Sequence, residues 1–348
     1  MNLRDLKKLA QWFLKNQRPL PWRKTSPDPY EIWISEVMSQ QSTMPTVVAY
    51  WNRWMQVFPS RKKLAKAPEI EVLKIWAGLG YYSRARNVLK AAHFMEDMED
   101  LESAKKIAEV SWPIDHQRWT EVPGVGPYTA KAICAIAFRH SVLPIDGNVI
   151  RVIARYFGIF NPLNVRLDRQ KIDERVAEIE NLLQPSMAAE VAQGFMELGS
   201  LLCRPGALAL CRDCPIQSGC QARIQNQVAL IPAKKQSATA IKEILLVHLQ
   251  EKKGRVLVSQ IPAASRLAGQ WELPLETIKD KKNKYLKGLK PIRHSITKYR
   301  YEAYPRWEAR VPRELLGERP TRFVDPKDPV ELAQLTTLSR KILAASFP

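Results

Sequence analysis

The sequence predicts a multidomain protein in which an all-α region is followed by a smaller α+β domain. Apolar residues recur with helical spacing from Leu3 to about Glu197. A polar segment over residues 225–240 is predicted to be a linker. Beyond it, apolar runs at 244–249 and 256–261 flank a Lys-Lys-Gly turn, which is typical of strands. A chain of 348 residues is long enough for two or three domains.

Composition narrows the class of partner. The net charge is +19 and the pI is about 9.8, so a polyanion such as nucleic acid is the leading inference, although a basic soluble protein without such a partner has the same composition. No apolar run reaches the ~20 residues of a membrane span. The first helix contains Asp5, which is unlike a signal peptide. We expect a cytoplasmic, nucleoid-associated monomer without membrane contact.

The N-terminal region supplies the first candidate residues. An amphipathic helix over residues 3–14 is followed by the proline-containing segment 18–23, which cannot be regular helix and whose Trp22 either contacts DNA or packs in the core. Residues 29–41 then form a helix with an apolar stripe. Glu36 lies beside that stripe, where it is either an ordinary surface glutamate or a functional acid.

Two further predicted helices, at 47–58 and 70–77, precede a glycine-rich segment that carries two tyrosines and two arginines. Two packed tyrosines are the simplest interpretation, which we adopt for Tyr81. Arg84 and Arg86 are candidate phosphate contacts.

The chain is organised around residues 121–131, which predict a helix, a hairpin and a second helix. Gly124 and Gly126 allow another backbone to come close, and Pro127 suits the first position of a helix. Free amides beside a positive helix end can bind a phosphate without any side chain. An ordinary corner between two helices has the same local pattern.

Asp146 follows this hairpin by about twenty residues and precedes another helical run. It is either a helix N-cap or a carboxylate aimed at a developing cation, and Asn148 lies two positions further on. A phosphate-binding hairpin followed by such a carboxylate suggests chemistry on DNA.

Four of the five cysteines lie close together, in the spacing C-x7-C-x2-C-x5-C. Crowding of this kind indicates a metal site in a reducing compartment rather than disulfides. Four thiolates suit either an iron–sulfur cluster or a structural zinc ion. The remaining residue, Cys134, is expected to be a buried thiol.

These segments together resemble a known family. Val-Pro-Gly-Val-Gly followed by Asp-Gly-Asn is similar to the helix-hairpin-helix DNA glycosylases. Trp-Ile-Ser-Glu-Val-Met and Gly-Leu-Gly-Tyr-Tyr-Ser-Arg-Ala-Arg-Asn resemble the adenine glycosylase branch, called MutY. That family binds a 4Fe–4S cluster with a C-x6-C-x2-C-x5-C loop, so the present loop is one residue longer in its first gap.

The resemblance, combined with the phosphate contacts inferred above, predicts a set of site residues. The catalytic residues are Glu36, Asp146, Tyr128 and Asn148; the DNA contacts are Gln40, Gln41, Tyr82, Arg84, Arg86, Gly124, Val125, Gly126, Thr297 and Lys298; the cluster ligands are Cys203, Cys211, Cys214 and Cys220. The implied domains are an iron–sulfur helical domain (1–23 and 140–224), a six-helix domain (24–139), the linker (225–240) and a Nudix-like domain (241–348).

The implied reaction is hydrolysis of the N-glycosidic bond of adenine mispaired with 8-oxoguanine or guanine in double-stranded DNA. The flipped base is protonated at N7 by Glu36, whose pKa must lie above about 4.3, and Asp146 stabilises the oxocarbenium ion. Asn148 orients Asp146 or a DNA phosphate, and Tyr128 forms a hydrogen bond near the reaction centre. Tyr82 is a wedge pressed into the base stack.

The C-terminal third resembles the family more loosely. Leu-Ala-Gly-Gln-Trp-Glu-Leu-Pro at 267–274 is similar to a Nudix-like domain, but the glutamate-rich motif that binds Mg²⁺ is missing from the sequence. Thr297 and Lys298 stand where the family has a Ser-His pair that contacts 8-oxoguanine, so that preference is expected but weakened. The segment 279–290 holds six lysines and one acid, and is either a solvated loop or a contact to the DNA backbone.

Three other functions are compatible with parts of the sequence. A bifunctional glycosylase and lyase would carry a Schiff-base lysine where this chain has Tyr128, although Lys131 lies one helical turn away. We therefore predict no efficient strand cleavage. The second function is that of a helix-hairpin-helix module without enzymatic activity, and the third is that of a zinc-stapled nucleic-acid-binding protein.

Overall fold

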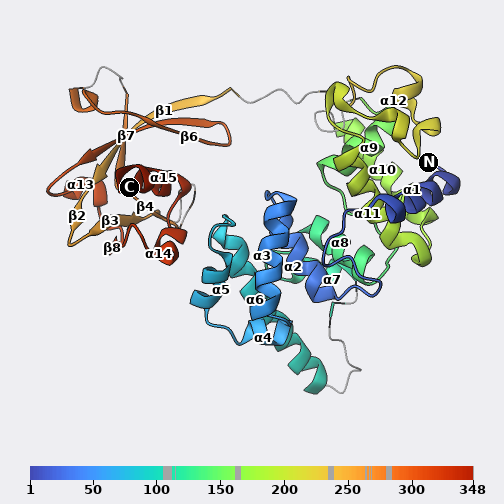
Figure 1. Ribbon diagram of the computed structural model, residues 1–348, viewed down its shortest axis with the longest axis horizontal. Helices are drawn as coiled ribbons and strands as arrows, with labels where there is room; N and C mark the ends of the chain where they lie inside the picture. The colour runs from blue at the N-terminus through green and yellow to red at the C-terminus, as the bar shows by residue number, and fades with distance from the viewer. Residues whose placement is uncertain are drawn as a thin grey trace. The chain divides into compact units, whose positions relative to one another are not determined.

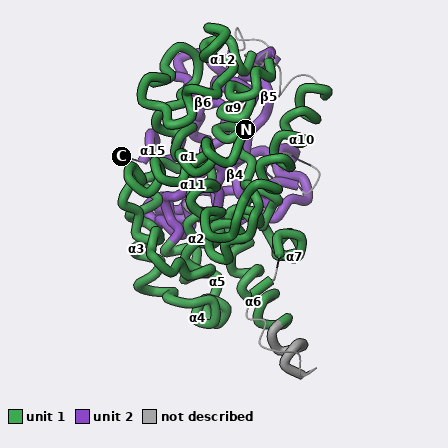
Figure 2. Tube along the Cα trace, turned by 90° about the vertical axis from the view of Figure 1, so that its right-hand side faces the viewer, with its two compact units in different colours: residues 1–75, 83–235 green, residues 76–82, 236–348 purple. Residues whose placement is uncertain are grey.

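The computed structural model describes residues 1–104, 112–113, 115–160, 166–233, 239–262, 265, 267, 269–279 and 284–347. Contacts divide the chain into two compact units, one of residues 1–75 and 83–235, the other of residues 76–82 and 236–348, coloured separately in Figure 2. Each unit is described by itself. The first unit is helical and the second is α+β, so the predicted fold class is confirmed. Residues 234–238 of the predicted linker lie outside the described residues.

Helices account for the regular structure of the described part of the first unit (Figure 1). They are α1 (Leu3–Asn16), α2 (Pro29–Ser39), α3 (Met44–Val57), α4 (Arg61–Ala65), α5 (Glu69–Trp76, whose last residue groups with the second unit), α6 (Tyr82–Ala104), α7 (His116–Glu121), α8 (Pro127–Ala137), α9 (Gly147–Phe157), α10 (Arg166–Leu182), α11 (Pro185–Leu201) and α12 (Gln221–Ile224). Three 3-10 turns, η1 (Gly206–Leu208), η2 (Cys211–Asp213) and η3 (Gln217–Gly219), lie between α11 and α12. No helix in the described part of the chain is both long and apolar enough to span a membrane.

Helix starts follow local capping chemistry. The side chains of Asp28, Asp115 and Asp146 accept backbone N–H groups at the starts of α2, α7 and α9. Proline occupies the first turn of α2 and α8, where its missing N–H costs nothing. The predicted helix, hairpin and helix are confirmed as α7, residues 122–126 and α8.

Close packing brings α9 against α11. A Cβ at Gly199 would lie 2.7 Å from the Cβ of Asn148, so glycine is required where α11 meets the start of α9. Leu198 on α11 and Leu6 and Leu9 on α1 belong to one buried cluster with Val149 and Ile153 of α9. This cluster holds the N-terminus of α9, and with it Asp146, in place.

The second unit contains two small sheets. The first has the strand order β5 (Leu275–Ile278), β1 (Ile241–Leu249), β7 (Tyr299–Trp307) and β6 (Ile292–Ile296), with β1 and β7 parallel and Ile241 opposite Tyr299. The second joins β2 (Glu251–Lys252), β3 (Arg255–Gln260), β4 (Trp271–Glu272) and β8 (Thr321–Val324). The remaining elements are η4 (Lys284–Leu286), α13 (Arg313–Leu316), α14 (Pro329–Ala333) and α15 (Thr337–Ser346). The strands predicted at 244–249 and 256–261 are confirmed as β1 and β3.

Candidate active site

Glu36 lies on the inner part of α2, half-buried between the buried residues Ser35 and Val37. Burial raises the pKa of Glu36 to about 7, and the nearby carboxylate of Asp146 acts in the same direction. A hydrogen bond from Tyr128 and the charge of Arg23 oppose the rise in pKa. These features are unlike those of a fully exposed surface glutamate.

Asp146 serves as the N-cap of α9 and faces the same space. Its Oδ1 accepts the backbone N–H of Val149 at 2.8 Å, and its Oδ2 accepts the side-chain amide of Asn148 at 3.0 Å. The interpretation of this aspartate as a helix N-cap is confirmed, and its second carboxylate oxygen bonds Asn148. The orienting contact expected of Asn148 is present in the structure.

A cleft of about 490 Å³ brings these side chains together. Glu36 of α2, Tyr128 of α8 and Asp146 at the start of α9 all line it, although they are far apart in the sequence. The sulfur of Met196, a weak acceptor, lies 3.1 Å from the hydroxyl of Tyr128 and competes with Glu36 for the single phenolic proton. Burial raises the pKa of Tyr128 above its usual range, and the charges of Glu36 and Asp146 add to this, so the phenol stays neutral.

An ion-pair network at the rim of the cleft was not found from the sequence. Glu197 of α11 is 1% exposed and accepts two hydrogen bonds from the guanidinium of Arg18 at 2.8 and 2.7 Å. Arg23 reaches the same carboxylate at 3.1 Å. Burial by itself would raise the pKa of Glu197, but the hydrogen bonds from Arg18 and Arg23 lower it to about 2. The available signal in the sequence was an acidic residue, Glu197, within the apolar helical run of residues 185–201.

A second unforeseen link connects the cleft to the cysteine segment. Arg151, one turn into α9, donates to the side-chain oxygen of Asn148 at 2.8 Å and to the carbonyl oxygen of Gly199 at 2.7 Å. Its Nε donates to the carbonyl oxygen of Cys203 at 2.8 Å. A continuous series of hydrogen bonds therefore runs from Asp146 through Asn148 and Arg151 to the first cysteine.

The prediction for Arg84 is corrected by the structure. Its side chain is buried, and one guanidinium nitrogen donates to the carbonyl oxygens of Val37, Met38 and Gln40 at 2.8, 3.1 and 2.6 Å. Those carbonyls lie at the C-terminal end of α2, where no helical N–H remains to pair with them. Arg84 is therefore a support of the helix that carries Glu36 rather than a phosphate contact.

The environment predicted for one of the two tyrosines is corrected as well. Tyr81 is 59% exposed and has a φ of 48°, so the expectation that it packs in the core is wrong. Tyr82 is half-buried, its hydroxyl accepts the backbone N–H of Gly78 at 3.1 Å, and the guanidinium of Arg340 lies 5.8 Å from its ring centre. The exposed ring in this segment belongs to Tyr81.

The remaining predicted DNA contacts of the first unit lie at or near its surface. Gln40 ends α2 and donates to the hydroxyl of Thr129 at 3.4 Å, while Gln41 is exposed with a φ of 58°. Arg86 forms an ion pair with Glu69 at 2.9 Å, and its side chain remains 37% exposed.

The hairpin itself presents its two glycines to solvent. Gly124 has a φ of 78°, and a Cβ there would lie 2.6 Å from the Cβ of Asn87, so glycine is required by the fold. Nothing lies within 4 Å of a Cβ at Gly126, so the chain itself does not require glycine there. Val125 is buried and its amide donates to the carbonyl oxygen of Val122 at 3.0 Å, which leaves the glycine amides as the accessible donors.

In the second unit, Thr297 and Lys298 form the two-residue turn between β6 and β7, where Ile296 pairs with Tyr299. Both residues are exposed, and Thr297 has a φ of 51°. The Lys298 ammonium lies 5.6 Å from the centre of the Tyr299 ring. Ala268 of the Nudix-like motif and residues 280–283 of the lysine segment lie outside the described residues.

The four clustered cysteines surround one small cavity of about 30 Å³. Cys203, Cys211, Cys214 and Cys220 all line it and are all half-buried free thiols. Glycine is required at position 219, next to Cys220, because a Cβ there would clash with the hydroxyl of Tyr156. Cys134 is a separate, fully buried thiol on α8, as expected.

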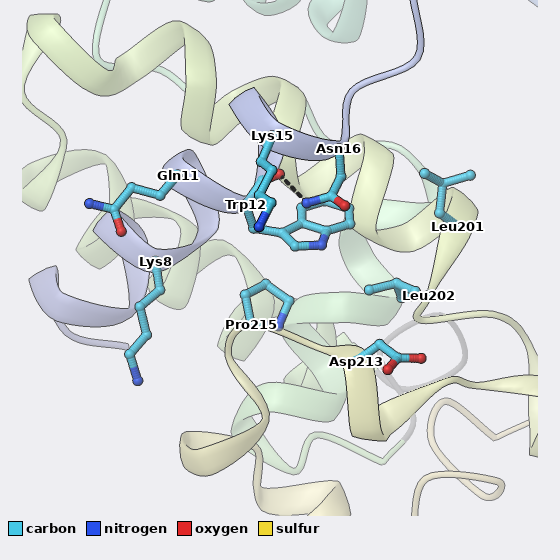
Figure 3. Close-up of a pocket in the computed structure, with 9 residues that line it drawn as sticks. All are labelled: Lys8, Gln11, Trp12, Lys15, Asn16, Leu201, Leu202, Asp213 and Pro215. Carbon is cyan, nitrogen blue, oxygen red and sulfur yellow. Dashed lines mark hydrogen bonds between the residues drawn. The ribbon is translucent and has the colours of Figure 1, made fainter.

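A larger concavity of about 810 Å³ lies between α1 and the segment around η2 (Figure 3). It is lined by Lys8, Gln11, Trp12, Lys15, Asn16, Leu201, Leu202, Asp213 and Pro215. Asp213 is the one carboxylate in that lining, so this concavity cannot place two acids on either side of a scissile bond. Its size alone does not make it the reaction site.

Comparisons with known proteins agree with this geometry. The model of the HhH-GPD superfamily base excision DNA repair protein matches residues 34–175, which include Glu36, the hairpin and Asp146. The described helical unit is similar in fold to a solved thermostable thymine-DNA glycosylase, with a TM-score of 0.52 and 22% identity over 63% of this chain and 95% of that one. The chain is thus a member of the helix-hairpin-helix superfamily of base excision DNA repair proteins.

Relatives in sequence define the branch of this superfamily to which the chain belongs. An adenine DNA glycosylase of Arabidopsis thaliana is 32% identical over 305 residues, covering 76% of this chain and 46% of the relative. One of Homo sapiens is 37% identical over 223 residues, covering 62% and 38%, and one of Buchnera aphidicola is 31% identical over 240 residues, covering 68% and 64%. The chain belongs to the adenine DNA glycosylase (MutY) family, and it spans about half the length of these relatives.

Proposed function

We propose that this protein hydrolyses the N-glycosidic bond of adenine mispaired with 8-oxoguanine or guanine in double-stranded DNA. The observation that carries the proposal is the presence of Glu36 and Asp146 in one cleft, with the pKa of Glu36 raised to about 7. Glycosidic cleavage needs a proton for the leaving base and an anion beside the oxocarbenium ion. The adenine must leave the base stack to reach the cleft.

Each residue has a defined task in this mechanism. Protonated Glu36 transfers its proton to N7 of adenine, and the bonding electron pair leaves with the base. The carboxylate of Asp146, directed by Asn148, stabilises the positive charge that remains on the sugar. Glu36, now ionised, accepts a proton from the attacking water, which restores the acid and completes hydrolysis.

A single-turnover assay with enzyme in excess tests the proposed function. Adenine should be released from duplexes containing A:8-oxoguanine and A:G pairs, and not from a matched A:T duplex. A duplex containing thymine glycol is the comparison substrate. Release of thymine glycol without release of adenine would contradict the proposal in favour of a glycosylase for oxidised pyrimidines.

We further infer that the protein is monofunctional. The amine of Lys131 forms an ion pair with Glu180 at 2.7 Å, and Glu180 also accepts the backbone N–H of Leu143 at 2.8 Å. An amine engaged in an ion pair in this way is a poor nucleophile, and the phenol of Tyr128 cannot form an imine.

Borohydride should therefore trap no covalent complex with substrate DNA, and Lys131→Ala should leave the rate of adenine release unchanged. The variant Glu180→Gln removes the ion-pair partner of the Lys131 amine, and it is compared with the wild type in the same trapping assay. A trapped adduct that is present in the wild type and absent from Lys131→Ala would show that the protein is a lyase as well.

The proposed DNA contacts follow the exposed groups. The glycine amides of the hairpin and the exposed Gln41 remain candidates, as do the half-buried Gln40 and Arg86. Tyr82, which is half-buried, remains the proposed wedge, and the exposed Tyr81 beside it is a second candidate. In the second unit, the Thr297 hydroxyl and the Lys298 ammonium are proposed to contact 8-oxoguanine.

Lysines of the second unit are proposed to contact the phosphate backbone of the DNA. Lys284, Lys287 and Lys290 are exposed at every third position, while Leu286 and Leu289 pack inward beneath them. Changing the three lysines to glutamine should reduce the slope of log K against log salt by about one for each phosphate that a lysine no longer neutralises, measured by binding titrations on undamaged duplex.

The matched control changes three other exposed lysines of the same unit, Lys252, Lys253 and Lys327, to glutamine. Its salt slope should equal that of the wild type. Equal slopes in both triple variants would mean that the lysine segment is only a solvated loop.

A 4Fe–4S cluster is the proposed cofactor. The four thiols around one cavity fit such a group, and the extra residue in the first cysteine gap lies in the loop between Cys203 and Cys211 without removing either thiol from the cavity lining. The cluster is proposed to fold and stabilise the segment of residues 203–220 when bound. Equal amounts of iron and acid-labile sulfide with brown colour would support the cluster, whereas zinc without sulfide would contradict it.

A further inference from the structure

The buried guanidinium of Arg155 on α9 has an unusual set of partners. The residue is 2% exposed, and it donates to the carbonyl oxygens of Ile231 at 2.7 Å, Arg204 at 2.7 Å and Gly206 at 3.2 Å. None of these acceptors is a carboxylate, and no ion pair in the described part of the chain includes Arg155. Arginine does not lose its proton in proteins, and burial of an uncompensated charge is costly. A negative charge must therefore lie close to it.

The cysteines beside Arg155 can supply that charge. Its Nη1 donates to Cys203 Sγ at 3.3 Å, and Cys220 Sγ lies 3.4 Å from the main-chain carbonyl oxygen of Arg155. Arg155 also lines the small cavity together with all four cysteines. Net charge and hydrogen bonds to the sulfurs are among the factors that set the reduction potential of an iron–sulfur cluster.

We propose that Arg155 is the internal counter-ion of the four-cysteine site and the positioning residue of its longest loop. The second role follows from its bonds to the carbonyls of Arg204 and Gly206, which lie between Cys203 and Cys211. The inference rests on the proposed cluster but not on the proposed substrate, because none of these contacts involves the cleft of Glu36.

The test compares the full-length variants Arg155→Met and Arg155→Lys with wild-type protein. Removal of the positive charge should move the midpoint potential of the cluster to more negative values, because the reduced form carries more negative charge. Arg155→Met should also lose iron faster in air. Arg155→Lys keeps the charge and should restore most of the potential, while loss of the carbonyl bonds leaves it with faster iron loss than the wild type.

Arg223 provides the matched control, because it lines the same cavity but is exposed to water. Arg223→Met should keep the wild-type potential, since solvent already screens its charge. A purely structural role predicts a lower melting temperature for Arg155→Met with an unchanged potential, and that result would overturn the proposal. Equal shifts of potential in Arg155→Met and Arg223→Met would do the same.

Arg155→Gln takes the place of Arg155→Met if the latter does not accumulate as folded protein, and the same shift in potential is expected. Metal analysis of the wild type separates this inference from the cofactor proposal. A wild-type chain that holds zinc would refute both, whereas iron with an unshifted potential in the neutral variants would refute only the role of Arg155.

Discussion

Changing Glu36 to glutamine is expected to lower the single-turnover rate of adenine release by about 10²- to 10⁴-fold, the usual contribution of a positioned general acid. Glutamine has nearly the same shape but cannot transfer a proton to N7. Binding of the mispaired duplex should remain close to that of the wild type. The measurement is a single-turnover time course on an A:8-oxoguanine duplex, with binding measured in parallel.

The pH dependence gives this prediction a second readout. The pKa of Glu36 is about 7, so the wild-type rate should fall as the pH rises through that value and the acid loses its proton. Glu36→Gln should show no such fall. Because the folded pKa lies above the unfolded value, wild-type stability should also decrease as the pH rises from about 4.5 to about 7. The variant should lack that decrease.

Glu31→Gln is the matched control on the same helix, since Glu31 pairs with Lys24 at 2.6 Å and does not line the cleft. Its rate and pH profile should match the wild type. Wild-type activity in Glu36→Gln would show that Glu36 is not the catalytic acid. The protein would then be a DNA-binding protein, and the activity of the sample would have another source.

Changing Asp146 to asparagine should lower the rate by about 10²- to 10³-fold, which is typical of the loss of one preorganised electrostatic contact. Asparagine still accepts the N–H of Val149 and still caps α9, so the fold should be retained. The loss then reports the missing negative charge beside the oxocarbenium ion. Single-turnover rates and melting temperatures of the variant and the wild type separate the two roles.

Asp328→Asn is the matched control, because Asp328 caps α14 through Val330 at 2.7 Å and lies in the other unit. Both variants should have similar, small changes in melting temperature, but only Asp146→Asn should lose activity. If Asp146→Asn loses stability and activity in proportion, the aspartate is a cap alone and the proposed stabilisation of charge is wrong.

Local chemistry accounts for what could be predicted about the fold. The caps at Asp28 and Asp146, the helix start at Pro127 and the strands that follow the linker depend on residues only a few positions apart. The same is true of the hairpin, whose Gly124 has the positive φ that a turn requires. Such features were therefore predictable from short segments of sequence.

The surroundings of each side chain in the folded protein account for what could not be predicted from the sequence. Arg84 and Arg86 are two positions apart in a similar pattern, yet one is buried on helix carbonyls and the other pairs at the surface. Tyr81 and Tyr82 are adjacent, yet Tyr81 is exposed, contrary to prediction, and Tyr82 is half-buried. Exposure depends on which distant elements cover a side chain, and no local pattern carries that information.

Sequence alone thus determined the helical class of the first unit, the hairpin and the four-cysteine segment, because residue type and spacing define them. The two acids were predicted only through the resemblance to a known family. Only the tertiary structure decided that Glu36 and Asp146 line one cleft, that the pKa of Glu36 is about 7, and that the buried Arg155 lies beside the cysteines. Desolvation and charge pairing arise between segments far apart in the chain, so these properties exist only after the chain has folded.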